Sequence, residues 1–418
     1  MIRDFKKKIK IQFFNISSGT LIVLVDQLSI LISLPYITSS LGFEAFGILT
    51  QGLIIYQIGS ICMDFGCNYS SIFFTKSDES DNISLEKILL PIFAIKFCIF
   101  ILVFIFAAIL NFYLNFITFS TPLFFMIMLA VFLAGNNPRW IYQVKLQNYY
   151  LLIATIIARI IFLIIIFINV TQPSDIIWYF IAINVCFLII NINAFIFFRK
   201  LKISIKGFKY FFKIIKTSFS YFISNLINFN LNSLWSFALL ILGTPSQLIY
   251  FNLADQCYRA LNGLTGSIPT NLYSRFTKSF DVVNSIKASL FISFIVLIIY
   301  CLAYLFIDEV ITYFFDEIYL VSIQLIRFYI IASFFLSLTG LFGFPVFGLL
   351  TSAKKVRRII FFSGIINLFL FTYWIFYMEK LGLNIILIHL CINIFIFLFQ
   401  LLLILKNFNK KKYDNFLN

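Results

Sequence analysis

Seven ionisable side chains stand inside long apolar runs of this sequence, where a charge is costly. A charge near the middle of a bilayer costs about 2.5–3.5 kcal/mol on insertion scales, so each one is a candidate for ligand binding or ion coupling. Four of the seven are basic, and most of these have no obvious acidic partner in the sequence, so they predict a cationic cavity. Because the planar guanidinium group of arginine suits phosphate, the expected ligand is anionic and carries phosphate. The seven residues are Lys96, Arg159, Arg259, Arg327, Asp26, Asp64 and Asp255.

Asp255 and Arg259 are four positions apart and would share one face of a helix. One interpretation is an internal ion pair that lowers the cost of inserting both charges. The other is a coupled pair, in which Arg259 binds an anion and Asp255 titrates or releases it. Asp26 and Asp64 are the other candidates for ion coupling, although Asp64 can also be read as a residue that simply pairs with a neighbour.

A polar stretch interrupts the apolar run at residues 220–233. Its residues Asn225, Asn228 and Asn232 are separated by three and four positions, which places them on one helix face. Such a face suits a ligand rich in hydroxyl groups, so these three asparagines are candidate sugar contacts. Hydrogen bonding between helices explains the same pattern equally well.

Several kinds of chemistry are disfavoured by what the sequence holds. His389 is its one histidine, so it has no histidine-based triad or histidine metal cluster, and packing against neighbouring helices is favoured for it over proton relay. The seven cysteines all lie in apolar runs without metal-ligand spacing and are interpreted as small fillers. No phosphate-binding GKS or GKT loop occurs, so no cofactor is predicted.

The elements that position these residues are predicted to be membrane-spanning helices. Of 418 residues, 61% are hydrophobic and 12% are charged, which excludes a water-soluble domain. Backbone groups in lipid must bond within their own segment, so the expected fold is an all-α polytopic membrane protein with about 12 spans. The runs are 11–37, 44–74, 87–111, 117–142, 147–170, 174–198, 211–242, 246–275, 283–307, 320–351, 356–378 and 383–406.

The basic residues predict the orientation of these spans. With twelve spans, 27 of the 32 Lys and Arg residues, Arg139 among them, fall on the side of the two termini, and Lys380 falls opposite. Since basic residues collect in cytoplasmic loops, both termini are expected in the cytoplasm. The net charge of +15 is thereby explained without a nucleic-acid partner.

A long basic segment, residues 198–216, divides the spans into two groups of six. It predicts an N-terminal lobe, 1–205, and a C-terminal lobe, 206–418. A Leu-Gly pair recurs at 41–42 and 242–243, after the first span of each half. Two six-span halves of equal orientation indicate a transporter with a pseudo-twofold axis along the membrane normal.

Three stretches carry motifs of a known family. Residues 34–70 contain a proline–aromatic pair, L-G-x-E-x-F-G at 41–47, Tyr56 and a later F-G pair. Residues 137–163 contain P-x-W followed by Tyr142 and Gln143, and residues 241–278 contain Tyr250 ahead of an Ala-Asp pair and Arg259. In this order they resemble the Wzx-type polysaccharide flippases of the multidrug/oligosaccharidyl-lipid/polysaccharide (MOP) exporter superfamily. Gln256 departs from the pattern, since family members often carry a lysine there.

The resemblance implies two six-helix lobes around a central cavity. It also implies translocation of an undecaprenyl-pyrophosphate-linked oligosaccharide, such as an O-antigen unit of lipopolysaccharide, across the bacterial inner membrane, coupled to H⁺ or Na⁺. Membrane lipids, a polysaccharide polymerase and a chain-length regulator are the expected partners. The site residues predicted for the pyrophosphate and sugars are Arg159, Arg259, Arg327, Lys96, Asn225, Asn228 and Asn232.

Two other functions compete with this transporter. A multidrug or metabolite antiporter of the same superfamily would favour acids over bases in its cavity. A membrane polysaccharide polymerase would carry a large outer loop with basic catalytic residues, whereas the predicted outer loops are short and hold Lys380 as their one basic residue.

Overall fold

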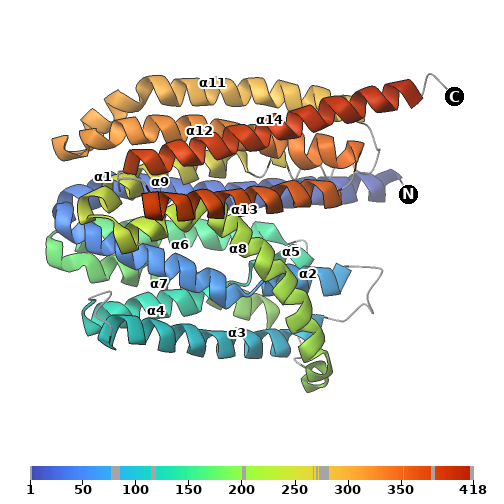
Figure 1. Ribbon diagram of the computed structural model, residues 1–418. Helices are drawn as coiled ribbons and strands as arrows, with labels where there is room; N and C mark the ends of the chain where they lie inside the picture. The colour runs from blue at the N-terminus through green and yellow to red at the C-terminus, as the bar shows by residue number, and fades with distance from the viewer. Residues whose placement is uncertain are drawn as a thin grey trace. The chain divides into compact units, whose positions relative to one another are not determined.

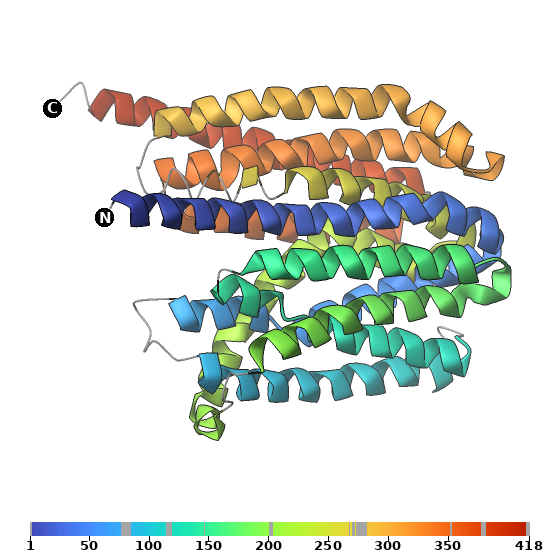
Figure 2. The ribbon, with the colours of Figure 1, turned by 180° about the vertical axis from the view of Figure 1, so that it is seen from behind.

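The computed structural model consists of helices joined by short turns, and it has no strand in the part of the chain that it describes. Residues 2–76, 85–113, 119–145, 147–199, 204–266, 268–269, 272, 282–351, 353–377 and 382–414 are described. Their contacts divide the chain into two units, Met1–Leu226 and Ile227–Asn418 (Figures 1 and 2). The predicted all-α membrane fold is confirmed.

The first unit is built on one long broken helix. In it, α1 packs against α4 and α6, and α7 packs against the same two helices, while η3 packs against α3. The elements are α1 (Ile2–Asp64), α2 (Cys67–Lys76), α3 (Leu85–Ala108), η1 (Ile109–Tyr113), α4 (Thr121–Gly135), α5 (Arg139–Lys145), α6 (Asn148–Asn169), η2 (Pro173–Asp175), α7 (Ile176–Phe198), η3 (Ile205–Tyr210) and the first half of α8 (Phe211–Leu242).

The second unit is centred on α12, which packs against α9, α11 and α14. Because Pro345 has no N–H, the carbonyl of Leu341 loses its helical donor, and Ser289 Oγ on α11 donates to it at 3.0 Å. The elements after α8 are α9 (Pro245–Thr265), α11 (Val282–Phe314), η4 (Glu317–Val321), α12 (Ser322–Phe342), the π-helix η5 (Gly343–Gly348), α13 (Ala353–Tyr377) and α14 (Gly382–Asp414).

Two glycines break the long N-terminal helix. Gly42 has φ 71° and ψ 177°, a conformation essentially restricted to glycine, and it separates the first two predicted spans. Gly66, also at φ 71°, follows the end of α1, and a Cβ there would lie 2.4 Å from the backbone oxygen of Ser218. Glycine at this position therefore lets α8 approach the break between α1 and α2.

Apolar helices long enough to cross a membrane make this a multi-pass membrane protein. Eight stretches of the described residues qualify by length and hydropathy, and one of them, Leu21–Ile72, contains the Gly42 break. The helices follow the order of the predicted runs, while the count of twelve spans stays a prediction. Exposed apolar side chains such as Phe291, Phe294 and Leu305 on α11 are suited to lipid.

The spatial division between the units falls within α8, whereas the predicted lobe boundary lies before it. The first half of α8 belongs to the first unit because it contacts the broken end of α1. Ser218 Oγ lies 2.7 Å from Ser70 Oγ, and the rings of Phe65 and Phe222 stack with centroids 5.0 Å apart. The boundary after residue 205 is a division of the sequence and stays a prediction.

Candidate functional site

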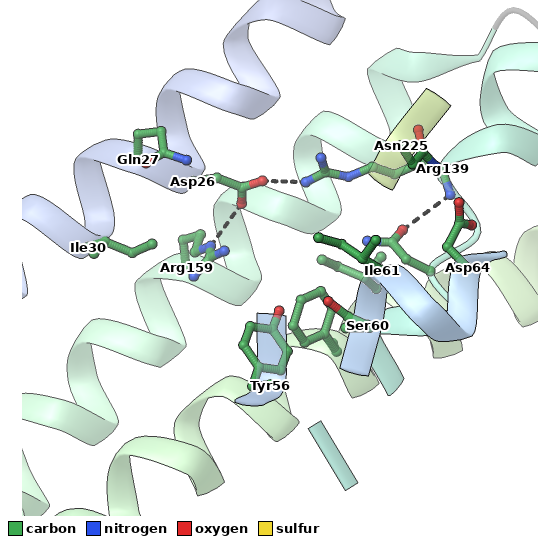
Figure 3. Close-up of a pocket in the computed structure, with 14 residues that line it drawn as sticks. Asp26, Gln27, Ile30, Tyr56, Ser60, Ile61, Asp64, Arg139, Arg159 and Asn225 are labelled. Carbon is green, nitrogen blue, oxygen red and sulfur yellow. Dashed lines mark hydrogen bonds and ion pairs between the residues drawn. The ribbon is translucent and has the colours of Figure 1, made fainter. Parts of the chain in front are cut away.

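A polar cavity of about 380 Å³ lies inside the first unit (Figure 3). It is formed where α1 meets α6, α7 and the α4–α5 turn, and α8 contributes one residue. Four of its lining residues are ionisable, two arginines and two aspartates. The lining consists of Asp26, Gln27, Ile30, Tyr56, Ser60, Ile61, Asp64, Ala134, Asn137, Arg139, Arg159, Phe187, Ile190 and Asn225.

The carboxylate of Asp26 joins two guanidinium groups in this cavity. Arg159 Nε donates to Asp26 Oδ1 at 2.8 Å, and Arg139 Nη2 donates to Oδ2 (Figure 3). The three side chains come from α1, α6 and α5, so the cluster connects three helices. Charge-assisted hydrogen bonds of this kind are the strong ones.

The short helix α5 holds Arg139 at the cavity. Its backbone N–H donates to Asn137 Oδ1 at 3.2 Å, which fixes the turn before the helix. Trp140 and Tyr142 are buried, and the Tyr142 hydroxyl donates to Asn193 Oδ1 at 2.5 Å. With these two aromatic side chains anchored, the guanidinium of Arg139 is directed toward Asp26.

Asp64 lines the far side of the cavity and is paired with Lys96 of α3. The Lys96 ammonium donates to Asp64 Oδ1 at 3.4 Å, to Asn68 Oδ1 at 3.1 Å and to the Gly135 carbonyl at 2.7 Å. Lys96 is 1% exposed and does not line the cavity. Its three N–H groups are therefore used to connect α3 to the end of α1 and to α4.

The second unit holds a separate charged cluster on α9. Arg259 donates to Asp255 Oδ2 from Nε at 2.8 Å and from Nη2 at 2.5 Å, so the two side chains form an ion pair within one helix, as their spacing predicts. Ser236 Oγ lies 3.5 Å from the same oxygen. Asp255 is 1% exposed, and its Oδ1 has no hydrogen-bond partner among the described residues.

The remaining base and the histidine of this unit also have partners. Arg327 Nη2 donates to Asp308 Oδ2 at 2.5 Å, and both side chains are more than a third exposed. His389 is buried with its Nε2 3.0 Å from the Tyr258 hydroxyl. The interpretation of His389 as a residue packed between helices is confirmed by its ring contacts with Tyr258 and Tyr329.

The expectation that most of the intramembrane bases lack a partner is wrong. Each of the four is paired with a carboxylate, and three of those pairs join residues far apart in sequence. Asn225 lines the cavity, as do Arg159, Asp26 and Asp64. The side chains of Asn228 and Asn232 lie outside the described residues.

Arg139 escapes prediction because the charge count places it at the cytoplasmic end of a span. The available signal is its position between Pro138 and Trp140, inside a motif that the sequence shares with flippases. Tyr56 is likewise a motif residue that lines the cavity, and Gln27 follows Asp26 directly. Charged or polar residues within such a motif are therefore good candidates for cavity-lining residues, even where they lie next to a predicted loop.

The comparison with protein families decides what kind of protein carries this cavity. The family of polysaccharide biosynthesis proteins matches residues 14–280, well over half of the chain. The chain belongs to this family. Its match includes every residue that lines the cavity, and the predicted resemblance to polysaccharide flippases of the MOP superfamily is confirmed. No curated protein matches the chain.

Solved structures show the same fold at low sequence identity. The lipid II flippase MurJ in an inward closed conformation is 16% identical, with a TM-score of 0.65 over 94% of this chain and 88% of that one. An inward-facing multidrug resistance MATE transporter of the MOP superfamily is 15% identical, with a TM-score of 0.60 over 93% and 95%. A MOP superfamily transporter from Pyrococcus furiosus, described by a reverse polarity of its binding pocket, has a TM-score of 0.53 at 15% identity over 94% and 96%. The chain is thus a member of the polysaccharide biosynthesis family with the fold of these MOP-superfamily transporters and of the MurJ flippase.

Proposed function

We propose that this family member flips an undecaprenyl-pyrophosphate-linked oligosaccharide, a unit of O-antigen or a similar surface polysaccharide, across the bacterial inner membrane. The observation that carries the proposal is the convergence of Arg139 and Arg159 in one polar cavity of a membrane-embedded unit. Two guanidinium groups facing one anion are an arrangement that suits a pyrophosphate. The family name and the MurJ-like fold support a lipid-linked ligand.

In this proposal the ligand is divided among three environments. The pyrophosphate binds the two arginines, and the sugars contact polar side chains such as Asn225, with Asn228 and Asn232 on the same helix. The polyprenyl tail stays in the surrounding lipid. A polysaccharide polymerase and a chain-length regulator would receive the translocated unit.

The sequence also predicts ligand contacts for Lys96, Arg259 and Arg327. Each is paired with a carboxylate in its own unit, and Lys96 has all three ammonium hydrogens engaged. We therefore give them a smaller share in ligand binding. Asp255 is the proposed coupling residue for H⁺ or Na⁺, because its buried Oδ1 has no donor among the described residues.

A drug antiporter is the second candidate, favoured by the two aspartates that line the cavity and by the fold shared with MATE transporters. Both aspartates are paired with bases, two arginines in the lining and Lys96 behind the wall. An organic cation would therefore meet no unpaired acid among the charged residues that line the cavity. The charge balance therefore favours the anionic ligand.

The test is flipping in proteoliposomes by the full-length protein. The ligand is a fluorescent prenyl-pyrophosphate-linked oligosaccharide, and its exposure to an outside quencher is followed over time. Arg139→Gln/Arg159→Gln should slow flipping by about 100-fold or more, as expected when about 3 kcal/mol of ligand binding is lost. Lys145→Gln is the matched control, because it removes an exposed charge from the same helix α5. A double variant that elutes as a folded protein and still flips at the wild-type rate would refute the proposal, and export of organic cations alone would favour the antiporter.

A further inference from the structure

The cavity already contains an anion, the carboxylate of Asp26, bound between its two arginines. We propose that Asp26 stands in for the phosphate of the ligand: it holds both guanidinium groups in the empty carrier, yields them to the arriving pyrophosphate, and takes them back when the ligand leaves. This inference rests on the proposed function. It gives Asp26 a role in release that is separate from ion coupling.

The geometry is that of an occupied anion site. Arg159 binds one carboxylate oxygen and Arg139 binds the other, so the two guanidinium groups are spaced for two oxygens of a single anion (Figure 3). A phosphoryl group offers the same pair of oxygens and one or two more. The Nε of Arg139 is buried and makes no hydrogen bond with any described residue, so it can donate to an additional oxygen of the phosphoryl group.

The exchange requires only side chains to move. Asp26 is on α1, whereas Arg139 and Arg159 are on α5 and α6, so the carboxylate can separate from both arginines by a rotamer change. Gln27 and Tyr56 line the same cavity and carry neutral donors that can receive the displaced carboxylate (Figure 3). The local pair of Asp255 and Arg259, four positions apart on one helix, offers no such separation of partners.

Electrostatics gives the exchange its direction at both stages. Two unpaired guanidinium groups inside a membrane protein would be costly, and the carboxylate removes that cost while the carrier is empty. The pyrophosphate linkage carries two negative charges and displaces a single one. After translocation the same carboxylate is attached to the chain at a high effective concentration, so it competes for the arginines and favours release.

The consequence is that Asp26 weakens binding and speeds turnover. A carrier that held the pyrophosphate with two uncompensated arginines would bind it tightly and release it slowly, and release limits many catalytic cycles. Asp26→Asn should therefore bind the ligand more tightly and flip it more slowly. If Asp26 had a purely structural role, its replacement would neither tighten ligand binding nor slow flipping by slowing release.

The experiment measures the affinity and the flipping rate of Asp26→Asn in the full chain. The probe is a short-chain prenyl pyrophosphate linked to N-acetylglucosamine. We expect its dissociation constant to fall about tenfold, within the usual range of coupling between competing groups. Steady-state flipping should fall by a similar factor while the first turnover stays fast. Asp26→Glu, which keeps the charge, should stay near the wild type in both measurements.

Controls separate the failure of this inference from the failure of the proposed function. Asp308→Asn removes an arginine-paired carboxylate of the second unit and should leave the dissociation constant unchanged. If Asp26→Asn and the smaller Asp26→Ser bind the probe as the wild type does, or more weakly, the stand-in role is wrong. If Arg159→Gln also binds like the wild type, the cavity is not the ligand site and the proposed function fails with it.

Discussion

Each unit contains a buried aspartate, and the two aspartates are paired with arginine in different ways. In the first unit Asp26 is bound by two arginines from two other helices, next to a cavity. In the second unit Asp255 is bound by Arg259 of its own helix, and one of its oxygens stays without a partner among the described residues. In our proposal the first arrangement exchanges its anion for a ligand, whereas the second keeps its arginine and leaves one carboxylate oxygen for a coupling ion.

The largest effect is expected from removing both arginines of the first unit. Arg139→Gln/Arg159→Gln leaves the Asp26 carboxylate without a cation, which should lower the free energy of unfolding by about 3–5 kcal/mol. Adding Asp26→Asn should recover most of that stability, but not flipping. Thermal melts in detergent and flipping assays measure the two quantities. A triple variant that flips at the wild-type rate would show that the cluster is only structural.

The next effect concerns Lys96, which supports the cavity wall from behind. Lys96→Met removes three hydrogen bonds and leaves Asp64 unpaired, so the free energy of unfolding should fall by about 3 kcal/mol. Ligand affinity of the folded protein should change little, because Lys96 does not line the cavity. Lys145→Met serves as the control for an exposed lysine. If folded Lys96→Met loses ligand binding but keeps its stability, the ligand contact predicted from the sequence is the correct one.

A smaller effect is expected for the pair in the second unit. Arg259→Gln, Asp255→Asn and the double variant form a cycle whose coupling free energy should be about 1–3 kcal/mol. Asp255→Asn should also abolish the dependence of flipping on an H⁺ or Na⁺ gradient, while Arg259→Gln keeps the carboxylate and part of that dependence. Flipping rates with and without each gradient measure this. Wild-type gradient dependence in Asp255→Asn would remove this residue from coupling.

The smallest effect is expected where α11 supports the proline break of α12. Ser289→Ala leaves the Leu341 carbonyl without its donor and should cost about 1 kcal/mol of unfolding free energy. Ser293→Ala is the matched control, because its hydroxyl donates within its own helix to the Ser289 carbonyl. Equal melting temperatures for the two variants would mean that the hydrogen bond between the helices adds nothing.

The sequence predicts contacts well where they are local. The helical fold follows from apolar composition, and the pair of Asp255 and Arg259 follows from a spacing of four residues. Gly42, noted as part of a repeated Leu-Gly pair, does mark the break between the first two predicted spans. In each case the relevant geometry is set within one turn of helix or by one backbone conformation.

Contacts between helices could not be predicted in the same way. Asp26 and Arg159 are separated by 133 positions, and nothing in their spacing indicates that α1 and α6 pack together. Arg139 is a charged residue at the predicted cytoplasmic end of a span, and the burial of Trp140 and Tyr142, which helps direct it toward the cavity, is set by packing between helices. The expectation of unpaired bases failed for this reason, since their carboxylate partners lie mostly on other helices.

We propose above all that the ligand binds the arginine pair of the first unit. The most direct test measures the dissociation constant of a short-chain prenyl pyrophosphate linked to N-acetylglucosamine for the wild type, Arg139→Gln/Arg159→Gln and Arg259→Gln. We predict about a hundredfold weaker binding for the double variant and a change within about twofold for Arg259→Gln. A larger loss from Arg259→Gln than from the double variant would contradict the account.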